Sequence, residues 1–158
     1  MNNVAINSDG CILPIWSSSA CNYALKVLKE LKRDNWELSI LFCGNDKITE
    51  LNNKYRDKNE PTDILSFNLG ETIIEDGKTV YLPGDIIISL DTLRENAEYF
   101  QIPQDEELRR LLIHGILHLD GMDHETLDSN EPMLKLQEEI LIKLKDEKIE
   151  SFYNGVKK

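Results

Sequence analysis

The sequence predicts an α+β fold in which helices pack on a small mixed β-sheet of about four strands. Segments with helical periodicity alternate along the chain with short segments rich in β-branched and aromatic residues. Residues 85–90 are a predominantly apolar run, which is typical of an interior strand covered on both faces. Residues 111–119 are apolar nearly all round a helix, so we expect this helix to run through the core.

Periodicity divides the first 68 residues into strands and helices. Ser17 to Ser19 can cap the first helix, and Pro61 forces an extended backbone before the third strand. We expect strands at residues 3–7, 36–43 and 62–68, and helices at residues 20–31 and 46–56.

Turn and cap residues divide the second half of the chain. The Asp76-Gly77 pair predicts a small hairpin within the otherwise irregular stretch 70–84. Thr92 and Glu95 have the spacing of a capping box, and Pro132 suits the start of a last helix. We expect a strand at 85–90, helices at 92–100, 105–119 and 132–144, and a loose tail at 150–158.

Composition indicates an ordinary protein with one core. The chain has 158 residues, of which 41% are hydrophobic and 30% are charged, and we expect residues 1–158 to form a single domain. The sequence contains neither an apolar run of membrane-spanning length nor an export-type N-terminus, so we expect a cytoplasmic protein without membrane contact. Cys11, Cys21 and Cys43 lack metal-ligand spacing, and we expect buried reduced thiols.

All three histidines of the chain lie between residues 111 and 124. His114 and His118 are four residues apart, so a helix places their side chains on one face. Gly121 can end that helix with a chain reversal that brings His124 back toward them. Three imidazoles with a fourth position open form the ligand set of a catalytic zinc site, and we expect one Zn²⁺ per chain.

The spacing of these histidines also matches the H-E-x-x-H-x-x-G-x-x-H pattern of metzincin peptidases, with one exception. Gly115 stands where those peptidases have the glutamate that acts as general base. The sequence therefore predicts the metal ligands of such a site without the base that peptide hydrolysis requires.

The run His-Gly-x-Leu-His-Leu-x-Gly-x-Asp-His resembles the signature of the YbeY family, bacterial endoribonucleases implicated in ribosomal RNA maturation. Residues 51–67, Leu-Asn-Asn-Lys-Tyr-Arg-Asp-Lys-Asn-Glu-Pro-Thr-Asp-Ile-Leu-Ser-Phe, and residues 84–89, Gly-Asp-Ile-Ile-Ile-Ser, are similar to further segments of that family. The resemblance covers roughly residues 36–145. It implies the same α+β fold and a metal-dependent hydrolase domain.

The resemblance implies a zinc-dependent, single-strand-specific endoribonuclease that acts in maturation of the 16S ribosomal RNA 3′ end and in ribosome quality control. Expected partners are single-stranded ribosomal RNA and the small ribosomal subunit or its associated proteins. Arg56 lies in a segment similar to that of the family's functional arginine, and a guanidinium offers paired donors that match phosphate geometry. We therefore expect Arg56 to bind substrate and to act in catalysis.

The proton-transfer group and two other functions stay open at this point. Asp85, Asp123 or Glu125 could take the proton, and the 2′-hydroxyl of the substrate could replace an activated water as the nucleophile. A zinc metallopeptidase with a relocated base is one alternative, and Gly115 weighs against it. A non-catalytic ribosome-assembly factor with a structural metal is the other, although structural zinc sites usually have four protein ligands that include cysteines.

The net charge of −11 opposes RNA binding, because the phosphate backbone is repelled by an acidic protein. An RNA enzyme with this charge needs a local basic patch or a partner that delivers the substrate. The candidate residues for such a patch are Lys47, Lys54, Arg56, Lys58, Arg109 and Arg110.

Overall fold

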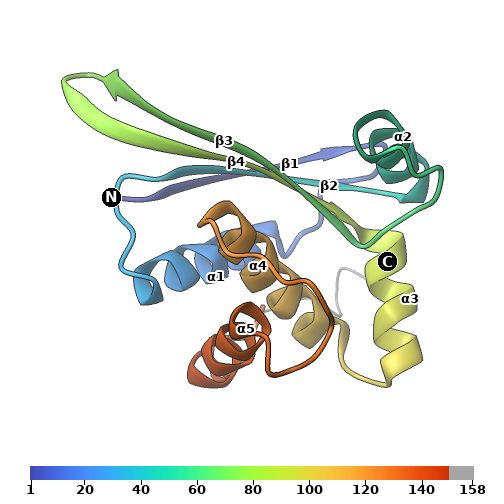
Figure 1. Cartoon of the computed structure of the whole chain (residues 1–158). Helices are drawn as coiled ribbons and strands as arrows, with labels where there is room; N and C mark the ends of the chain where they lie inside the picture. The colour runs from blue at the N-terminus through green and yellow to red at the C-terminus, as the bar shows by residue number, and fades with distance from the viewer. Residues whose placement is uncertain (150–158) are drawn as a thin grey trace.

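In the computed structural model, which describes residues 1–149, four strands form one sheet and five helices pack around it (Figure 1). The strands are β1 (Asn3–Asp9), β2 (Glu37–Cys43), β3 (Ile64–Glu75) and β4 (Lys78–Ser89). The helices are α1 (Ser17–Glu30), α2 (Asn45–Arg56), α3 (Leu90–Phe100), α4 (Gln104–Leu119) and α5 (Pro132–Lys143). The tail expected at residues 150–158 lies outside the described residues.

The sheet is mixed, which confirms the predicted α+β class. Its strand order is β1-β2-β4-β3, with parallel β1–β2 and β2–β4 pairs and an antiparallel β3–β4 pair. Helix α1 crosses over between the parallel strands β1 and β2, as parallel pairing requires. Strand β3 therefore lies at an edge of the sheet, with one side of its backbone unpaired by any described strand.

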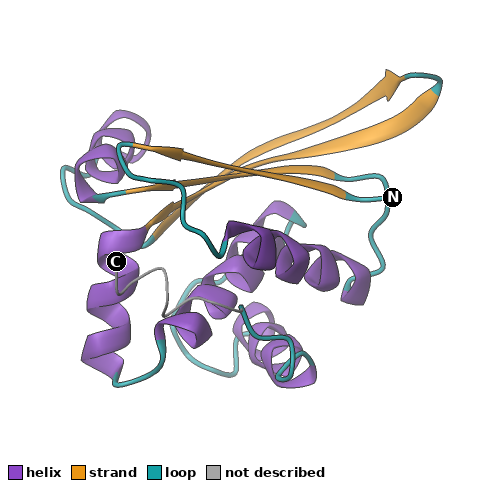
Figure 2. Ribbon diagram, turned by 180° about the vertical axis from the view of Figure 1, so that it is seen from behind, coloured by secondary structure: helices purple, strands orange, loops and turns teal. Residues whose placement is uncertain are grey.

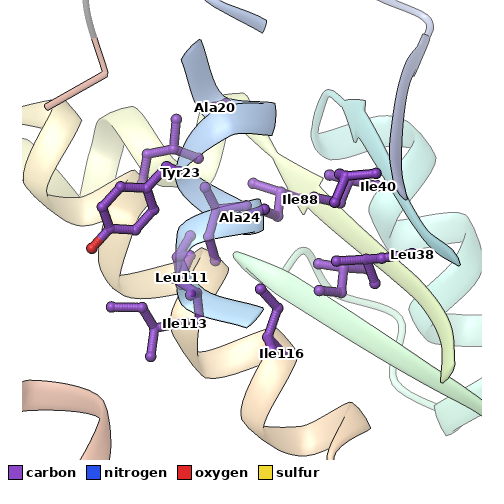
Figure 3. Close-up of a cluster of buried hydrophobic side chains, with 14 of the residues drawn as sticks. Ala20, Tyr23, Ala24, Leu38, Ile40, Ile88, Leu111, Ile113 and Ile116 are labelled. Carbon is purple, nitrogen blue, oxygen red and sulfur yellow. The ribbon is translucent and has the colours of Figure 1, made fainter. Parts of the chain in front are cut away.

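Four helices, α1, α3, α4 and α5, lie on one side of the sheet, and α2 lies on the other (Figure 1). The alternation of side chains along β4 separates the two faces: Ile86 and Ile88 join the large core with α1 and α4, whereas Ile87 packs with Ile48 and Leu65 on the α2 side. Figure 3 shows side chains of α1, α4 and the strands meeting in the large core.

Helix α4 runs through this core, as its apolar sequence predicts. Leu112, Ile113, Ile116 and Leu117 are fully buried. Gly115 faces the sheet, where a Cβ atom would lie only 2.9 Å from Cδ1 of Ile86. The absence of a side chain at residue 115 therefore lets α4 approach the sheet closely.

The boundaries predicted for residues 62–90 were wrong. Separate strands and a small hairpin were expected, but β3 and β4 are continuous strands of 12 residues each that form one long hairpin. The pairing of β3 with β4 shifts register between Asn68 and Glu71, opposite Gly84, and then resumes. The stretch 70–84, which the sequence indicated to be irregular, therefore belongs mostly to the two strands. The turn lies at Asp76 and Gly77 as predicted, both with positive φ, and the hairpin projects beyond the other strands (Figure 2).

Three other local predictions also needed correction. Ser17 to Ser19 lie within α1, whose N-cap is Trp16 with no side-chain cap hydrogen bond, so they do not cap the helix. The N-cap of α3 is Ser89, whose hydroxyl accepts the backbone N–H of Thr92, so Thr92 is not the capping residue. The Thr92 hydroxyl instead donates to the side-chain oxygen of Asn45 at 2.6 Å, which ties α3 to α2. Trp36 precedes β2 and forms only an isolated bridge with Tyr81.

The three cysteines are free thiols, as expected, but only Cys43 is buried, while Cys11 and Cys21 are half-buried. Burial raises the pKa of the Cys43 thiol to about 11, so this side chain is an inert apolar group at neutral pH. Within residues 1–149, no helix combines the length and apolar character needed to cross a bilayer.

Replacing Gly84 with alanine should lower the free energy of unfolding by more than about 2 kcal/mol. Gly84 has a φ of +136°, and an added Cβ would overlap the carbonyl oxygen of Phe67. Gly77→Ala is the matched control, because Gly77 also has positive φ but nothing within 4 Å of the added atom. We expect that control to cost about 1 kcal/mol. Urea unfolding of both variants tests this, and equal losses would show that Gly84 is not sterically constrained.

Candidate metal centre

The three histidines converge at the C-terminal end of α4, as their spacing predicts. The ring centroids of His114 and His118 are 4.6 Å apart, and the His124 ring lies 5.2 Å from the first and 5.4 Å from the second. One nitrogen from each ring lies within 4.8 Å of the others, so the three could hold one metal ion. Within residues 1–149, this is the only group of three or more such side chains that could do so.

A Schellman motif ends α4 and produces the chain reversal. The backbone N–H of Gly121 donates to the carbonyl of His118, and that of Met122 donates to the carbonyl of Leu117, each at 3.0 Å. Gly121 has a φ of +94°, as expected for the residue that reverses the chain. The reversal brings His124 back over the helix end.

The hydrogen bonds of the three rings leave the same nitrogen free on each. Nδ1–H of His114 donates to Oε1 of Gln137 at 2.6 Å, and Nδ1–H of His118 donates to the carbonyl of Met122 at 3.1 Å. Nδ1–H of His124 donates to the carbonyl of Thr126 at 2.9 Å. Carbonyl oxygens of the backbone and of the Gln137 amide can only accept, so the proton lies on Nδ1 and each Nε2 carries a lone pair.

These lone pairs point at one another. Nε2 of His114 lies 3.1 Å from Nε2 of His118, a separation at which two acceptors repel unless a cation or a proton lies between them. Nitrogens on one tetrahedral zinc ion would be about 3.3 Å apart, given Zn–N bonds of about 2.0–2.1 Å. The donor set therefore fits a small metal ion.

Burial favours the neutral form of the imidazoles that metal binding requires. Desolvation is the main cause that lowers the pKa of His114, and it also lowers the pKa of His118. Both rings are therefore unprotonated at neutral pH, so the metal would not have to displace a proton from them.

Gln137 is a site residue that the sequence interpretation missed. Its side-chain amide donates from Nε2 to Oε2 of Glu138 at 3.0 Å, which fixes Oε1 toward His114. Glu138 in turn accepts from Nε and NH2 of Arg110 at 3.0 and 3.1 Å. The available sequence signal was a polar residue, Gln137, within the apolar stripe of α5, and the structure shows that it is buried. Such partners fix the orientation of a metal-binding histidine.

Arg56 lies beside the histidines although it belongs to a different helix. It is the last residue of α2, and it lines a cavity of about 400 Å³ together with His114, His118 and Asp123. Its guanidinium donates from NH2 to the carbonyl of Ser66 at 2.9 Å, and its Cζ lies 5.7 Å from the centre of the Phe67 ring. Strand β3 therefore positions the guanidinium at the wall of the cavity.

The other residues of the expected basic patch do not line this cavity. Lys47 pairs with Asp9, Arg109 forms a buried ion pair with Asp105, and Arg110 is engaged by carboxylates. Lys54 lies over the ring of Tyr55, and Lys58 is exposed beyond the end of α2. Arg56 is thus the one of the six cations that lines this cavity with His114 and His118.

Of the three carboxylates that could transfer a proton, the structure places only Asp123 at the cavity. Asp123 lines the cavity, with Oδ1 3.9 Å from Nδ1 of His118, and it accepts the backbone N–H of His124. Glu125 is exposed and does not line the cavity. Asp85 is exposed on the α2 side of the sheet, because it alternates with Ile86 on β4, so the structure does not bring Asp85 to the histidines.

Gly121→Val should destabilise the domain by about 1–3 kcal/mol, because a β-branched residue resists the positive φ of +94° at this position. Nothing lies within 4 Å of the added Cβ, so the cost arises from the backbone alone. The variant should also bind Zn²⁺ more weakly, since His124 depends on this reversal. Thermal unfolding and zinc titration test both effects. Wild-type stability together with wild-type affinity would show that the turn does not position His124.

Comparisons with a family model and with known proteins all match the same family. The model of the family described as endoribonuclease YbeY matches residues 15–145, which extends the resemblance toward the N-terminus. The chain is 48% identical over 129 residues to endoribonuclease YbeY of Treponema denticola, covering 81% of this chain and 83% of that protein. It is 49% identical over 127 residues to endoribonuclease YbeY of Borreliella afzelii, covering 78% of this chain and 84% of that protein.

Among solved structures, the solution structure of TM1509 from Thermotoga maritima is similar, with a TM-score of 0.59 and 29% sequence identity. The match covers 90% of this chain and 92% of that one, so the likeness extends over nearly the whole fold. With the family match and the two relatives, it shows that the chain belongs to the endoribonuclease YbeY family.

Proposed function

We propose that residues 1–158 form a zinc-dependent endoribonuclease domain that cleaves single-stranded RNA. Its role would be maturation of the 16S ribosomal RNA 3′ end and ribosome quality control in the cytoplasm. The observation that carries this proposal is the cavity in which Arg56 faces His114 and His118. A metal ion and a cation that binds the phosphate oxygens both stabilise the charge that builds up in phosphodiester cleavage, and this cavity has residues suited to supply both. The names of the relatives support the same activity.

In this proposal His114, His118 and His124 hold the zinc ion through Nε2, and Gln137 orients His114. Zinc bound in such a set supplies Lewis acidity toward a phosphoryl oxygen. Imidazole ligands also suit other transition metals, so the choice of zinc rests on the three-histidine ligand set, which is typical of catalytic zinc.

Arg56 binds the phosphate in this proposal. Its bond to the Ser66 carbonyl uses one of the five N–H groups of the guanidinium, which leaves donors for a phosphate oxygen pair. The Phe67 ring and the Ser66 carbonyl hold the group in place before substrate binds, so little ordering is required at binding.

The nucleophile is best supplied by the RNA itself. Gly115 faces the sheet, so no side chain at this position can act as the base of a peptidase. The 2′-hydroxyl of RNA can attack the adjacent phosphorus and does not require an activated water molecule. The bond from phosphorus to the 5′-oxygen then breaks, which leaves a 2′,3′-cyclic phosphate and a 5′-hydroxyl end. The proton lost by the 2′-hydroxyl passes to solvent, and the departing 5′-oxygen takes one from solvent. Asp123 is the nearest exposed carboxylate, and its bond to the His124 backbone supports a positioning role for the loop.

The net charge of −11 supports recruitment of RNA through a partner. A single arginine in the cavity can bind a local phosphate but cannot attract a long RNA against this charge. We therefore propose that the small ribosomal subunit or its associated proteins present the single-stranded RNA to the cavity.

His118→Ala should remove most of the bound zinc while the domain stays folded, because the core is large enough to be stable without metal. Metal analysis after purification in metal-free buffer and reloading with Zn²⁺ measures the content per chain. Circular dichroism provides the control for folding. Retention of one zinc per chain in the His114, His118 and His124 single alanine variants would contradict this ligand assignment.

Arg56→Ala should reduce cleavage of single-stranded RNA by roughly 10²–10³-fold, by analogy with the loss of one donor to a developing oxyanion. Arg56→Lys should recover activity only in part, because an ammonium lacks the paired donors of a guanidinium. Zinc content should match wild type in both variants.

Lys58→Ala is the matched control for Arg56, since Lys58 is a nearby exposed cation that does not line the cavity. It should cleave RNA at close to the wild-type rate. Undiminished cleavage by Arg56→Ala would remove Arg56 from the site. Cleavage of casein but not RNA by the zinc-loaded wild type would refute the proposed function itself.

A further inference from the structure

A second cavity adjoins the metal centre on the side away from Arg56. Its volume is about 720 Å³, within the usual size range of small-molecule sites. It lies between α3, α4, α5 and the loop that joins α4 to α5, which swings toward α3 in Figure 1. Its apolar lining residues are Ile64, Phe100, Ile102, Leu111, Leu127 and Leu134.

The metal centre lies where the two cavities meet. His114 and Ile64 line both cavities, and His124 lines the second. A group bound at the histidines is therefore next to both spaces. One RNA strand could place its phosphate at the histidines and an adjacent base in the second cavity.

The two cavities differ in charge: the charged side chains that line the first cancel, whereas those that line the second are mostly acidic. The charged side chains that line the first are Arg56 and Asp123. The second is lined by four carboxylates, Asp63, Glu106, Glu107 and Glu138, against one arginine, Arg110.

Arg110 is already engaged within the second cavity. Its guanidinium lies 3.2 Å from Glu106, 3.7 Å from Glu107 and 3.0 Å from Glu138. Phosphate is therefore repelled from this space, whereas a neutral group with N–H donors finds many acceptors there.

An exposed aromatic ring at the second cavity suits a flat ligand. Phe100 is 60% exposed at the end of α3, and Leu127 on the loop is 86% exposed. Large apolar side chains so exposed at a cavity indicate a surface that binds a ligand. The Phe100 ring already contacts the Tyr99 ring edge-on, with centroids 5.0 Å apart, so one of its neighbours is aromatic.

We infer that this second cavity binds one unpaired nucleobase of the RNA strand, next to the phosphate held at the histidines. The base stacks on Phe100, and the carboxylates accept hydrogen bonds from its amino and imino groups. Apolar and aromatic walls with acceptors for the base edge are the usual features of single-stranded RNA recognition.

This inference rests on the proposed function and extends it to substrate selection. A base already paired in a duplex has its donor groups engaged and cannot leave the stack without cost. The cavity thereby gives a physical reason for single-strand specificity. Guanine, adenine and cytosine carry exocyclic amino donors and should be preferred over uracil at this position. Uracil has no amino group, and its imino N–H lies between two carbonyl oxygens that the carboxylates repel.

The test uses zinc-loaded full-length protein and single-stranded RNA oligonucleotides that are cleaved at one phosphate. Each position flanking that phosphate is varied among the four bases and an abasic residue. At one position the abasic residue should reduce kcat/KM by roughly 5- to 150-fold, the range expected for loss of one base–aromatic stack. Uracil there should be cleaved more slowly than the other three bases.

Phe100→Ala should reduce kcat/KM for the intact oligonucleotide by a similar factor. For this variant, the abasic residue should cause no further loss of kcat/KM. Tyr99→Ala is the matched control, because Tyr99 is the neighbouring exposed aromatic residue and does not line the cavity. It should behave as wild type. Thermal unfolding of both variants provides the control for folding.

A second measurement does not depend on activity. An oligonucleotide with 2-aminopurine at the sensitive position should lose fluorescence on binding to metal-free wild type and Tyr99→Ala, but not to Phe100→Ala. The inference is overturned if wild type cleaves RNA equally with any base or none at each flanking position, or if Phe100→Ala matches Tyr99→Ala in both measurements. Absence of RNA cleavage by wild type would refute the proposed function, and the fluorescence result would then decide the base site alone.

Discussion

The close approach of α4 to the sheet is the constraint on which the metal centre depends. Gly115 makes it possible, because a Cβ atom at this position would lie 3.1 Å or less from side-chain atoms of Ile86 and Ile64. With the glycine against the sheet, His114 and His118 stand beside the edge strand β3, and Arg56 reaches the same space by bonding to that strand. A larger residue 115 would have to displace the side-chain ends of Ile86 and Ile64 or move the helix that carries the imidazoles.

The same glycine links packing to chemistry. A metzincin peptidase has a glutamate at this position, whereas here Gly115 packs directly against Ile86. The domain thus keeps a three-histidine ligand set while it lacks the group that would activate water for peptide hydrolysis. A substrate that carries its own nucleophile suits such a centre, which is why RNA is a better match than a peptide.

Local patterns in the sequence predicted most of the fold and the histidine cluster. The i, i+4 spacing and the glycine reversal are local rules, so His114, His118 and His124 could be placed without tertiary information. The long β3–β4 hairpin was missed because pairing across a register irregularity depends on the partner strand. Two other features depend on tertiary structure for a related reason. Gln137 reaches His114 from α5, a helix later in the chain, and the alternation of side chains along β4 turns Asp85 away from the histidines.

The two cavities suggest how a protein of charge −11 handles a polyanion. In the proposed function Arg56 is the cation that would bind a phosphate, and the carboxylates around Arg110 would repel phosphate from the adjoining space. Repulsion of the RNA phosphates from most of the protein surface weakens non-specific binding. An RNA strand therefore stays bound only if its groups fit the two cavities. In the proposed function acidity would then increase selectivity, and a ribosomal partner would offset the cost in affinity by raising the local concentration of RNA.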